Sequence, residues 1–182
     1  MTAVSMTDYS NFTAISMQDH SYYMSKAFEQ ALKAKALGEI PVGSVIVNSE
    51  GDIVASGYNR TISSNDPTAH AEIVALRSLG KKVLNYRFPD YSIYVTLEPC
   101  CMCAMALIHS RVKNLFFGAY DLKTGACGSA FNFIMNRKHN HRINVEGGIL
   151  KDECSNLLSA FFRERRAAHK SLKIIKNSDQ DL

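Results

Sequence analysis

Two short segments constrain this chain most, because their side chains are of the kinds that bind one metal ion together. His70 and Glu72 lie in the first segment, and Cys100 and Cys103 lie in the second. Three soft ligands, His70, Cys100 and Cys103, can hold one Zn²⁺ and leave its fourth tetrahedral position open, as in catalytic zinc sites. The sequence therefore predicts a fold that brings the two segments together.

Other interpretations of the cysteines are weaker. A Cys-x-x-Cys pair also occurs in redox dithiols, but a redox motif has no use for His70 and Glu72. A structural zinc normally has a fourth protein ligand. The candidates for that ligand have no paired spacing that recommends them: Cys127, Cys154, His109, His139 and His141. Cys101 offers a second pairing, yet positions three apart share a helical face, so we expect Cys101 to be a small packed residue.

Glu72 has the chemistry of a proton carrier. Zinc lowers the pKa of a bound water to about 7, and a neighbouring carboxylate can accept and deliver that water's proton. Glu72 follows His70 by two positions, which places it near the metal without making it a ligand. Alone, Glu72 would be interpreted as an acid stabilised at a helix N-terminus. The nearby ligands favour the catalytic interpretation.

Composition limits the class of protein. The chain has 182 residues, of which 46% are hydrophobic, enough for one domain with a substantial core. Its net charge of +4 does not by itself indicate a polyanionic partner. Five cysteines, three of them within residues 100–103, suit a reducing compartment, so we expect a cytoplasmic protein. No secretory signal and no apolar run of about 20 residues is present, so no membrane contact is expected.

Hydrophobic periodicity predicts the order of the elements. Residues 1–20 are expected to be a disordered tail, residues 21–176 a single domain, and residues 177–182 a second tail. We expect helices from Ser21 to about Gly38, from Asp66 or Thr68 as the cap to about Leu79, over 100–110 and over 151–173, and strands over 42–47, 53–58, 91–96, 114–118 and 143–147. This order predicts an α/β domain with helices on both faces of a five-stranded mixed sheet.

His70-Ala71-Glu72 with Pro99-Cys100-x-x-Cys103 resembles the signature of the zinc-dependent cytidine and deoxycytidylate deaminase superfamily. Within it, longer matches resemble the bacterial tRNA-specific adenosine deaminases. These matches are residues 65–72, 96–100, 108–111, 117–126, 140–142 and 161–166, and the resemblance covers about 21–166. It implies a three-layer α/β/α cytidine-deaminase-like fold that holds one Zn²⁺ per subunit.

The resemblance also implies an activity, the conversion of adenosine to inosine at the wobble position (34) of a tRNA anticodon. Zinc-bound hydroxide would attack adenine C6, Glu72 would move the protons, and ammonia would leave. The enzyme would be a homodimer that binds the anticodon stem-loop in a pocket drawing on both subunits. By analogy, Asn59 would hydrogen-bond the flipped base, and the other contacts near the anticodon would be Asp121, Lys123, Asn140, His141 and Arg165.

Local charge adds to this expectation. Positive residues gather near the C-terminus, against Glu164 alone: Arg163, Arg165, Arg166, Lys170, Lys173 and Lys176. Such a run is often only a solvated helix face, but beside a site that modifies a base it favours contact with phosphates. Asn59 could equally be a turn residue after a strand, and Asn140 and His141 are otherwise ordinary loop residues.

Two rival functions use the same residues. The first is a deaminase of a free base or nucleoside such as cytosine, guanine or cytidine, since the same zinc and glutamate would serve it. The second is a noncatalytic RNA-binding module with a structural zinc, in which the Glu72→Ala change would be harmless. The basic C-terminal helix and the 121–126 segment argue against the first.

Overall fold

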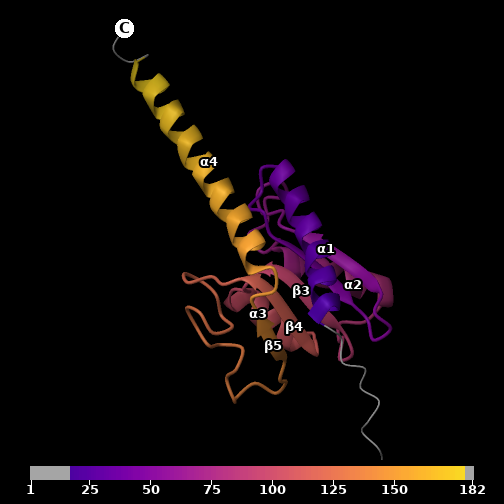
Figure 1. Ribbon diagram of the computed structural model, residues 1–182. Helices are drawn as coiled ribbons and strands as arrows, with labels where there is room; N and C mark the ends of the chain where they lie inside the picture. Colours follow the sequence, from indigo (N-terminus) through magenta and orange to yellow (C-terminus); the bar gives the residue numbers. More distant parts are fainter. Residues whose placement is uncertain (1–16, 179–182) are drawn as a thin grey trace, which may run out of the picture.

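The computed structural model describes residues 17–178 (Figure 1), so the predicted tail segments 1–16 and 179–182 lie outside the described residues. Residues 17–20, predicted to belong to the N-terminal tail, instead form the first turn of helix α1 (Met17–Ala36). His20 accounts for this earlier start, because its ring packs 4.2 Å from Phe116 and its Nδ1 lies 2.9 Å from the Tyr94 hydroxyl.

The predicted five-stranded mixed sheet is confirmed. Its strands lie in the order β2 (Ile53–Tyr58), β1 (Gly43–Val47), β3 (Ser92–Leu97), β4 (Asn114–Ala119) and β5 (Asn144–Gly147). Strand β1 is antiparallel to both β2 and β3, whereas β3, β4 and β5 are parallel to one another. The β1–β2 pair is the predicted hairpin, and Gly51 in its turn has a φ of +89°, which favours glycine.

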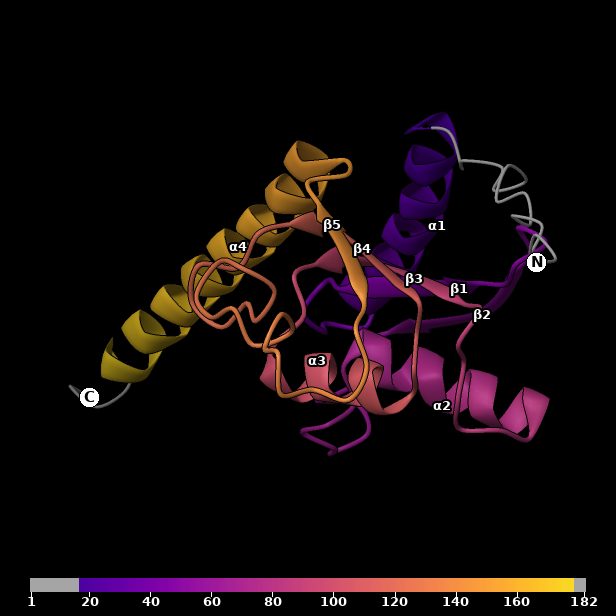
Figure 2. The same cartoon turned by 90° about the horizontal axis from the view of Figure 1, so that it is seen from below.

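Helices cover both faces of this sheet (Figures 1 and 2), which confirms the three-layer arrangement. Helices α1 and α4 (Lys151–Ser178) lie on one face, and α2 (Ala71–Val83) and α3 (Cys101–His109) lie on the other. Adjacent residues of β1 face opposite sides of the sheet, one towards α1 and the next towards α2. A Cβ at Gly43 would lie 2.2 Å from the backbone of Ala27 in α1, while the Ser44 hydroxyl donates to the Ala71 carbonyl of α2.

The core lies between the sheet and both helical layers. Among its largest fully buried side chains are Tyr94, Ile93, Ile46, Leu107 and Leu115. Tyr94 stacks on Phe116 with ring centroids 4.7 Å apart, which joins β3 to β4 across the sheet. This packing fixes β3 and β4, whose carboxyl ends lead into the segments that form the candidate site.

Helix α4 is only partly attached to the sheet. Cys154, Leu158 and Phe161 are buried, whereas residues 162–171 are exposed, and Figure 1 shows the helix projecting beyond the rest of the domain. The helix continues to Ser178, past the predicted end at Lys173. None of the helices within residues 17–178 has the length and apolar character that a membrane-spanning helix requires.

Candidate active site

The three predicted metal ligands lie together. His70 Nδ1 is 3.8 Å from Cys100 Sγ and 3.6 Å from Cys103 Sγ, and all three ligand atoms lie within 4.8 Å of one another. Zinc bonds of about 2.0 Å to nitrogen and about 2.3 Å to sulfur, at tetrahedral angles, place these atoms about 3.6 Å apart. The donor set and its spacing therefore fit one tetrahedral Zn²⁺.

Two helix N-termini point their backbone N–H groups towards this cluster. His70 is the N-cap residue of α2, and Cys100 is the N-cap residue of α3. The positive ends of both helix dipoles favour the negative charge of the thiolate ligands. The prediction that Asp66 or Thr68 caps α2 is wrong, because Asp66 instead accepts hydrogen bonds from the backbone N–H and the hydroxyl of Thr68.

Glu72 lies in the first turn of α2 and is only 3% exposed. Burial raises the pKa of Glu72 above its ordinary value of 4.5, and the positive charge of His70 opposes this effect without cancelling it. A carboxyl group with a raised pKa gains and loses a proton more readily near neutral pH. The position of Glu72 beside His70 therefore suits a proton carrier.

The two cysteine thiols shift each other's pKa in opposite directions. The hydrogen bond from the Cys103 thiol, helped by His70, lowers the pKa of Cys100 to about 4. The same bond and burial raise the pKa of Cys103, and the bond to Cys100 raises the pKa of His70. A divalent cation among the three groups would stabilise both thiolates, which is what a zinc ligand set requires.

Among residues 20–171, whose side chains the structure describes, no fourth histidine, cysteine or carboxylate joins the metal-ligand group. Cys127, Cys154, His109, His139 and His141, the alternative ligands, all lie outside it. Cys101 is exposed, so the prediction that it is a packed residue is wrong. The fourth position of a bound tetrahedral ion would be left to a nonprotein ligand.

The cluster opens into a hollow of about 650 Å³, a size typical of small-molecule sites. Besides the ligands His70 and Cys100 and the carboxylate Glu72, the residues Ile40, Val42, Leu97 and Glu98 and three further segments line it. These segments are Asn59 and Thr61 after β2, residues 119–124 after β4, and one face of α4 that includes Phe162, Arg163 and Arg166. The sequence singled out Asn59, Asp121 and Lys123 among these residues, and the structure places all three there.

Asn59 is buried, and its side-chain oxygen accepts the backbone N–H of Ala71 at 2.9 Å. This bond uses the oxygen, so the amide NH₂ is the part of Asn59 that can donate to a ligand in the hollow. Asp121 uses its carboxylate differently. It accepts from the backbone N–H groups of Lys123 and Thr124 and from the Thr124 hydroxyl, so it shapes the turn that presents Lys123.

Three predicted contact residues do not line the hollow. Arg111 donates to both oxygens of Asn140, and His141 Nε2 lies 2.8 Å from the Val112 carbonyl. Arg165 lies over the Phe161 ring, 5.6 Å from its centroid. The sequence predicted Arg163 and Arg166 only as members of a basic run that contacts phosphates, and the structure places both on the face of α4 that lines the hollow, with Ser155, Ser159 and Phe162.

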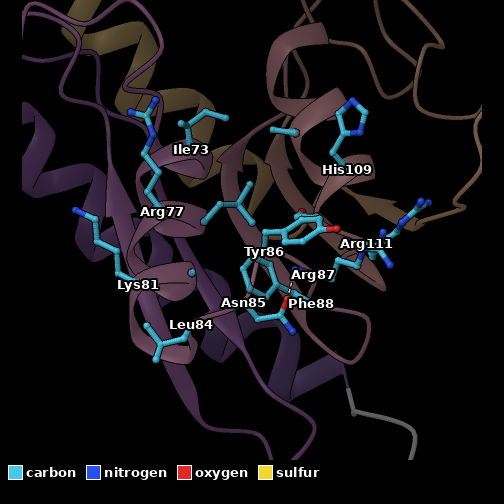
Figure 3. A pocket seen from close by; sticks show the side chains of 14 residues that line it. Ile73, Arg77, Lys81, Leu84, Asn85, Tyr86, Arg87, Phe88, His109 and Arg111 are labelled. Carbon is cyan, nitrogen blue, oxygen red and sulfur yellow. Dashed lines mark hydrogen bonds between the residues drawn. The ribbon is translucent and has the colours of Figure 1, made fainter.

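A second hollow, of about 1080 Å³, lies between α2, α3 and the loop that joins α2 to β3 (Figure 3). Its apolar lining includes Ile73, Leu76 and Phe88, together with the exposed side chains of Leu84 and Tyr86. Basic side chains border it, namely Arg77, Lys81, Arg87 and Arg111. None of the three metal ligands lines this second hollow.

Comparison with known proteins identifies the family to which this chain belongs. The sequence model of the cytidine and deoxycytidylate deaminase zinc-binding region matches residues 17–119, which is more than half of the chain. This match spans all three metal ligands and Glu72. The chain therefore belongs to this family of zinc-dependent deaminases.

Individual relatives narrow the class. The tRNA-specific adenosine deaminase of Haemophilus influenzae is 52% identical over 87% of this chain and 91% of its own length. The enzyme of the same name from Bacillus subtilis is 39% identical over 86% of this chain and 97% of its own. A structure from a study of A-to-I editing by tRNA:A34 deaminases superposes with a TM-score of 0.73 at 37% identity, over 76% of this chain and 99% of that one. Within the family, the chain groups with the tRNA-specific adenosine deaminases.

Proposed function

We propose that this protein hydrolyses adenosine to inosine at the wobble position (34) of a tRNA anticodon, with release of ammonia. The observation that carries the proposal is one hollow lined by His70 and Cys100 of the metal-ligand group, by the buried Glu72 and by two arginines of α4. The 52% identity to a tRNA-specific adenosine deaminase supports the choice of substrate. The proposal places the enzyme in the cytoplasm, where tRNA is used.

His70, Cys100 and Cys103 would hold the ion. When bound, zinc supplies a Lewis acid that acidifies the attacking water. Glu72 accepts a proton from that water and passes it to the adenine ring, and the amine then leaves as ammonia. Water adds one oxygen to C6 and the C6–N bond breaks, so one water is consumed for each ammonia released.

The walls of the hollow would bind the RNA. Asn59 would donate its amide NH₂ to the flipped base, and Lys123, Arg163 and Arg166 would contact the phosphates around it. A base in a single-stranded loop leaves its stack at low cost, which suits a site enclosed between a sheet and a helix.

A homodimer is the second part of the proposal. The second hollow has an apolar lining, with Leu84 91% exposed and Tyr86 68% exposed beside it (Figure 3). An apolar face of this kind fits a second copy of the chain. Arg111, which borders the second hollow, donates hydrogen bonds to Asn140, so Asn140 lies near the edge of this proposed interface.

The activity is tested with an anticodon stem-loop that carries adenosine at position 34. Inosine and ammonia should form from this RNA with the wild-type protein and not with the Glu72→Ala variant. Free cytosine, guanine, cytidine and adenosine serve as competing substrates. Turnover of these compounds alone would overturn the proposal in favour of a small-molecule deaminase, and unchanged activity of the variant would favour a noncatalytic role.

The dimer is tested by the mass of the protein in solution. Leu84→Glu places a charge on the apolar lining and should convert a dimer into a monomer in light scattering. Leu37→Glu is the matched control, because Leu37 is 57% exposed at the end of α1, away from the second hollow. A wild-type monomer, or a Leu84→Glu dimer, would contradict the proposed interface.

A further inference from the structure

Glu98 is a buried carboxylate that the mechanism above does not use. It is 2% exposed and lies two positions before Cys100. Its oxygens accept the backbone N–H groups of Asp121 at 3.0 Å, Cys127 at 2.9 Å and Ser129 at 3.1 Å. The Ser129 hydroxyl donates a further hydrogen bond. All of these donors belong to the single loop that follows β4.

This carboxylate depends on that loop. The ion pairs among the described residues join other side chains and do not include Glu98. A buried carboxylate is costly unless hydrogen-bond donors replace the water that it loses. Because the loop supplies those donors, moving the loop away from Glu98 would leave the buried group without them. The position of the loop and the burial of Glu98 are therefore linked.

The fit between Glu98 and the loop is close. A Cβ at Gly125 would lie 2.5 Å from the carboxylate of Glu98, so a side chain at position 125 would displace one of the two. The backbone N–H of Ala126 donates to the Pro99 carbonyl at 2.8 Å, and the backbones of Cys100 and Gly125 form an isolated antiparallel β-bridge. The loop is thus seated against the segment that carries a metal ligand.

The same loop forms one wall of the candidate active site. Asp121, Leu122, Lys123 and Thr124 line the hollow together with His70. The Glu98 carboxylate accepts a hydrogen bond from the backbone N–H of Asp121. The Asp121 carboxylate in turn accepts hydrogen bonds from the backbone N–H groups of Lys123 and Thr124. A continuous set of hydrogen bonds therefore runs from the buried Glu98 to the residues that face a ligand.

We propose that Glu98 is a positioning residue, which fixes the loop of residues 121–129, of which 121–124 form a wall of the active site, and thereby sets the affinity for the RNA. His70 and Glu72 are held by α2 and Cys103 by α3, and among the metal ligands and Glu72 the loop contacts only Cys100, so the chemical step depends less on this loop. The inference about affinity rests on the proposed function, whereas the inference about the loop does not.

Glu98→Gln tests both parts, because it keeps the shape and replaces one acceptor oxygen with a donor NH₂ that faces N–H groups. Hydrogen exchange of the Asp121, Cys127 and Ser129 amides, followed by NMR on the zinc-loaded protein, should accelerate by about 10- to 100-fold. The KM for the stem-loop should rise by a similar factor, with kcat changed less than threefold and one zinc retained per subunit. Glu146→Gln, at an exposed position on β5, is the control and should change none of these.

Two further variants keep the test decisive if Glu98→Gln does not fold. Ser129→Ala removes only the hydroxyl donor and should give a smaller change in the same direction. Gly125→Ala displaces the loop without altering charge and should raise KM and amide exchange together. Exchange that stays at the wild-type rate in all folded variants would overturn the proposal, as would a fall in kcat at constant KM. If the wild type does not deaminate the stem-loop, the proposed function fails, and amide exchange still decides the role of Glu98.

Discussion

The side-chain oxygen of Asn59 accepts the backbone N–H of Ala71 at 2.9 Å, directly after the metal ligand His70. Asn59 follows β2, and Ala71 is the first residue of α2, so this bond joins the end of a strand to the start of the helix that carries Glu72. Asn59 thus contributes to the position of Glu72 as well as facing the hollow.

The two roles of Asn59 can be separated. Asn59→Ala removes the acceptor for an N-terminal helix N–H and should lower the free energy of unfolding by about 1 kcal/mol in urea titrations. Asn59→Asp keeps an acceptor oxygen and should stay close to wild-type stability. Both changes remove the amide donor, so both should lower kcat/KM on the stem-loop. An Asp variant with full activity would show that the amide NH₂ does not contact the base.

Glu72→Gln should abolish proton transfer while leaving the fold intact. We expect deamination to fall by at least about 100-fold, which is typical of losing a general acid–base group. Zinc content and thermal stability should stay close to wild type, because Glu72 is not among the grouped metal ligands. Glu153→Gln, at an exposed position in α4, is the control. Loss of zinc from the Glu72 variant would mean that the carboxylate binds the metal instead.

Metal content should depend on His70 and Cys103 but not on Cys101. His70→Ala and Cys103→Ala each remove one of the three grouped ligands and should reduce zinc to well below one ion per subunit. Cys101→Ala is the matched control, since its exposed thiol lies outside the group. A strong chelator should lower the melting temperature of the wild type, because bound metal stabilises the folded state by mass action. Zinc loss in the Cys101 variant would mean that Cys101, and not only Cys100 and Cys103, binds the metal.

Arg163 and Arg166, which face the hollow, should contribute more to RNA binding than their neighbour Arg165 does. Replacing both Arg163 and Arg166 with Gln should weaken stem-loop binding and reduce the slope of log K against log salt by about 1.4, if each contacts one phosphate. Arg165→Gln should have a smaller effect, because Arg165 lies over Phe161 outside the hollow. Binding measured by fluorescence anisotropy at several salt concentrations distinguishes the two. An equal loss with Arg165→Gln would favour a diffuse charge effect of α4.

Glu39 should contribute a pH-dependent part of stability. Its buried carboxylate accepts from the Thr61 hydroxyl and from the N–H groups of Ile62 and Ser63. Burial alone would raise the pKa of Glu39, but these hydrogen bonds outweigh it and hold the pKa below 4.5.

Because the folded pKa of Glu39 is the lower one, its contribution is complete above the unfolded pKa of about 4.5 and is lost as pH falls through the folded value. Urea titrations between pH 7 and pH 3.5 should therefore show an acid loss of stability that is smaller in Glu39→Gln. Parallel curves for the two proteins would rule this contribution out.

Several features could be predicted from local sequence. Strand alternation and β-branched runs indicated all five strands to within one or two residues at their ends. The spacing of His70, Cys100 and Cys103 predicted a group that the structure brings together. Helix limits were harder to predict. Helix α2 begins at Ala71 because Asn59, distant in sequence, satisfies its first N–H group, and α1 begins early because His20 packs on another strand.

The sequence by itself determined the chemistry of the metal cluster, because ligand identity and short spacings are local properties of the chain. Tertiary structure alone decided which side chains surround that cluster. The rotation of α4 about its own axis, set by its packing on the sheet, places Arg163 and Arg166 in the hollow and Arg165 outside it. Hydrogen bonds from the loop to Glu98 fix the position of the wall that this loop forms. Both depend on contacts between residues far apart in sequence, which local pattern and charge do not encode.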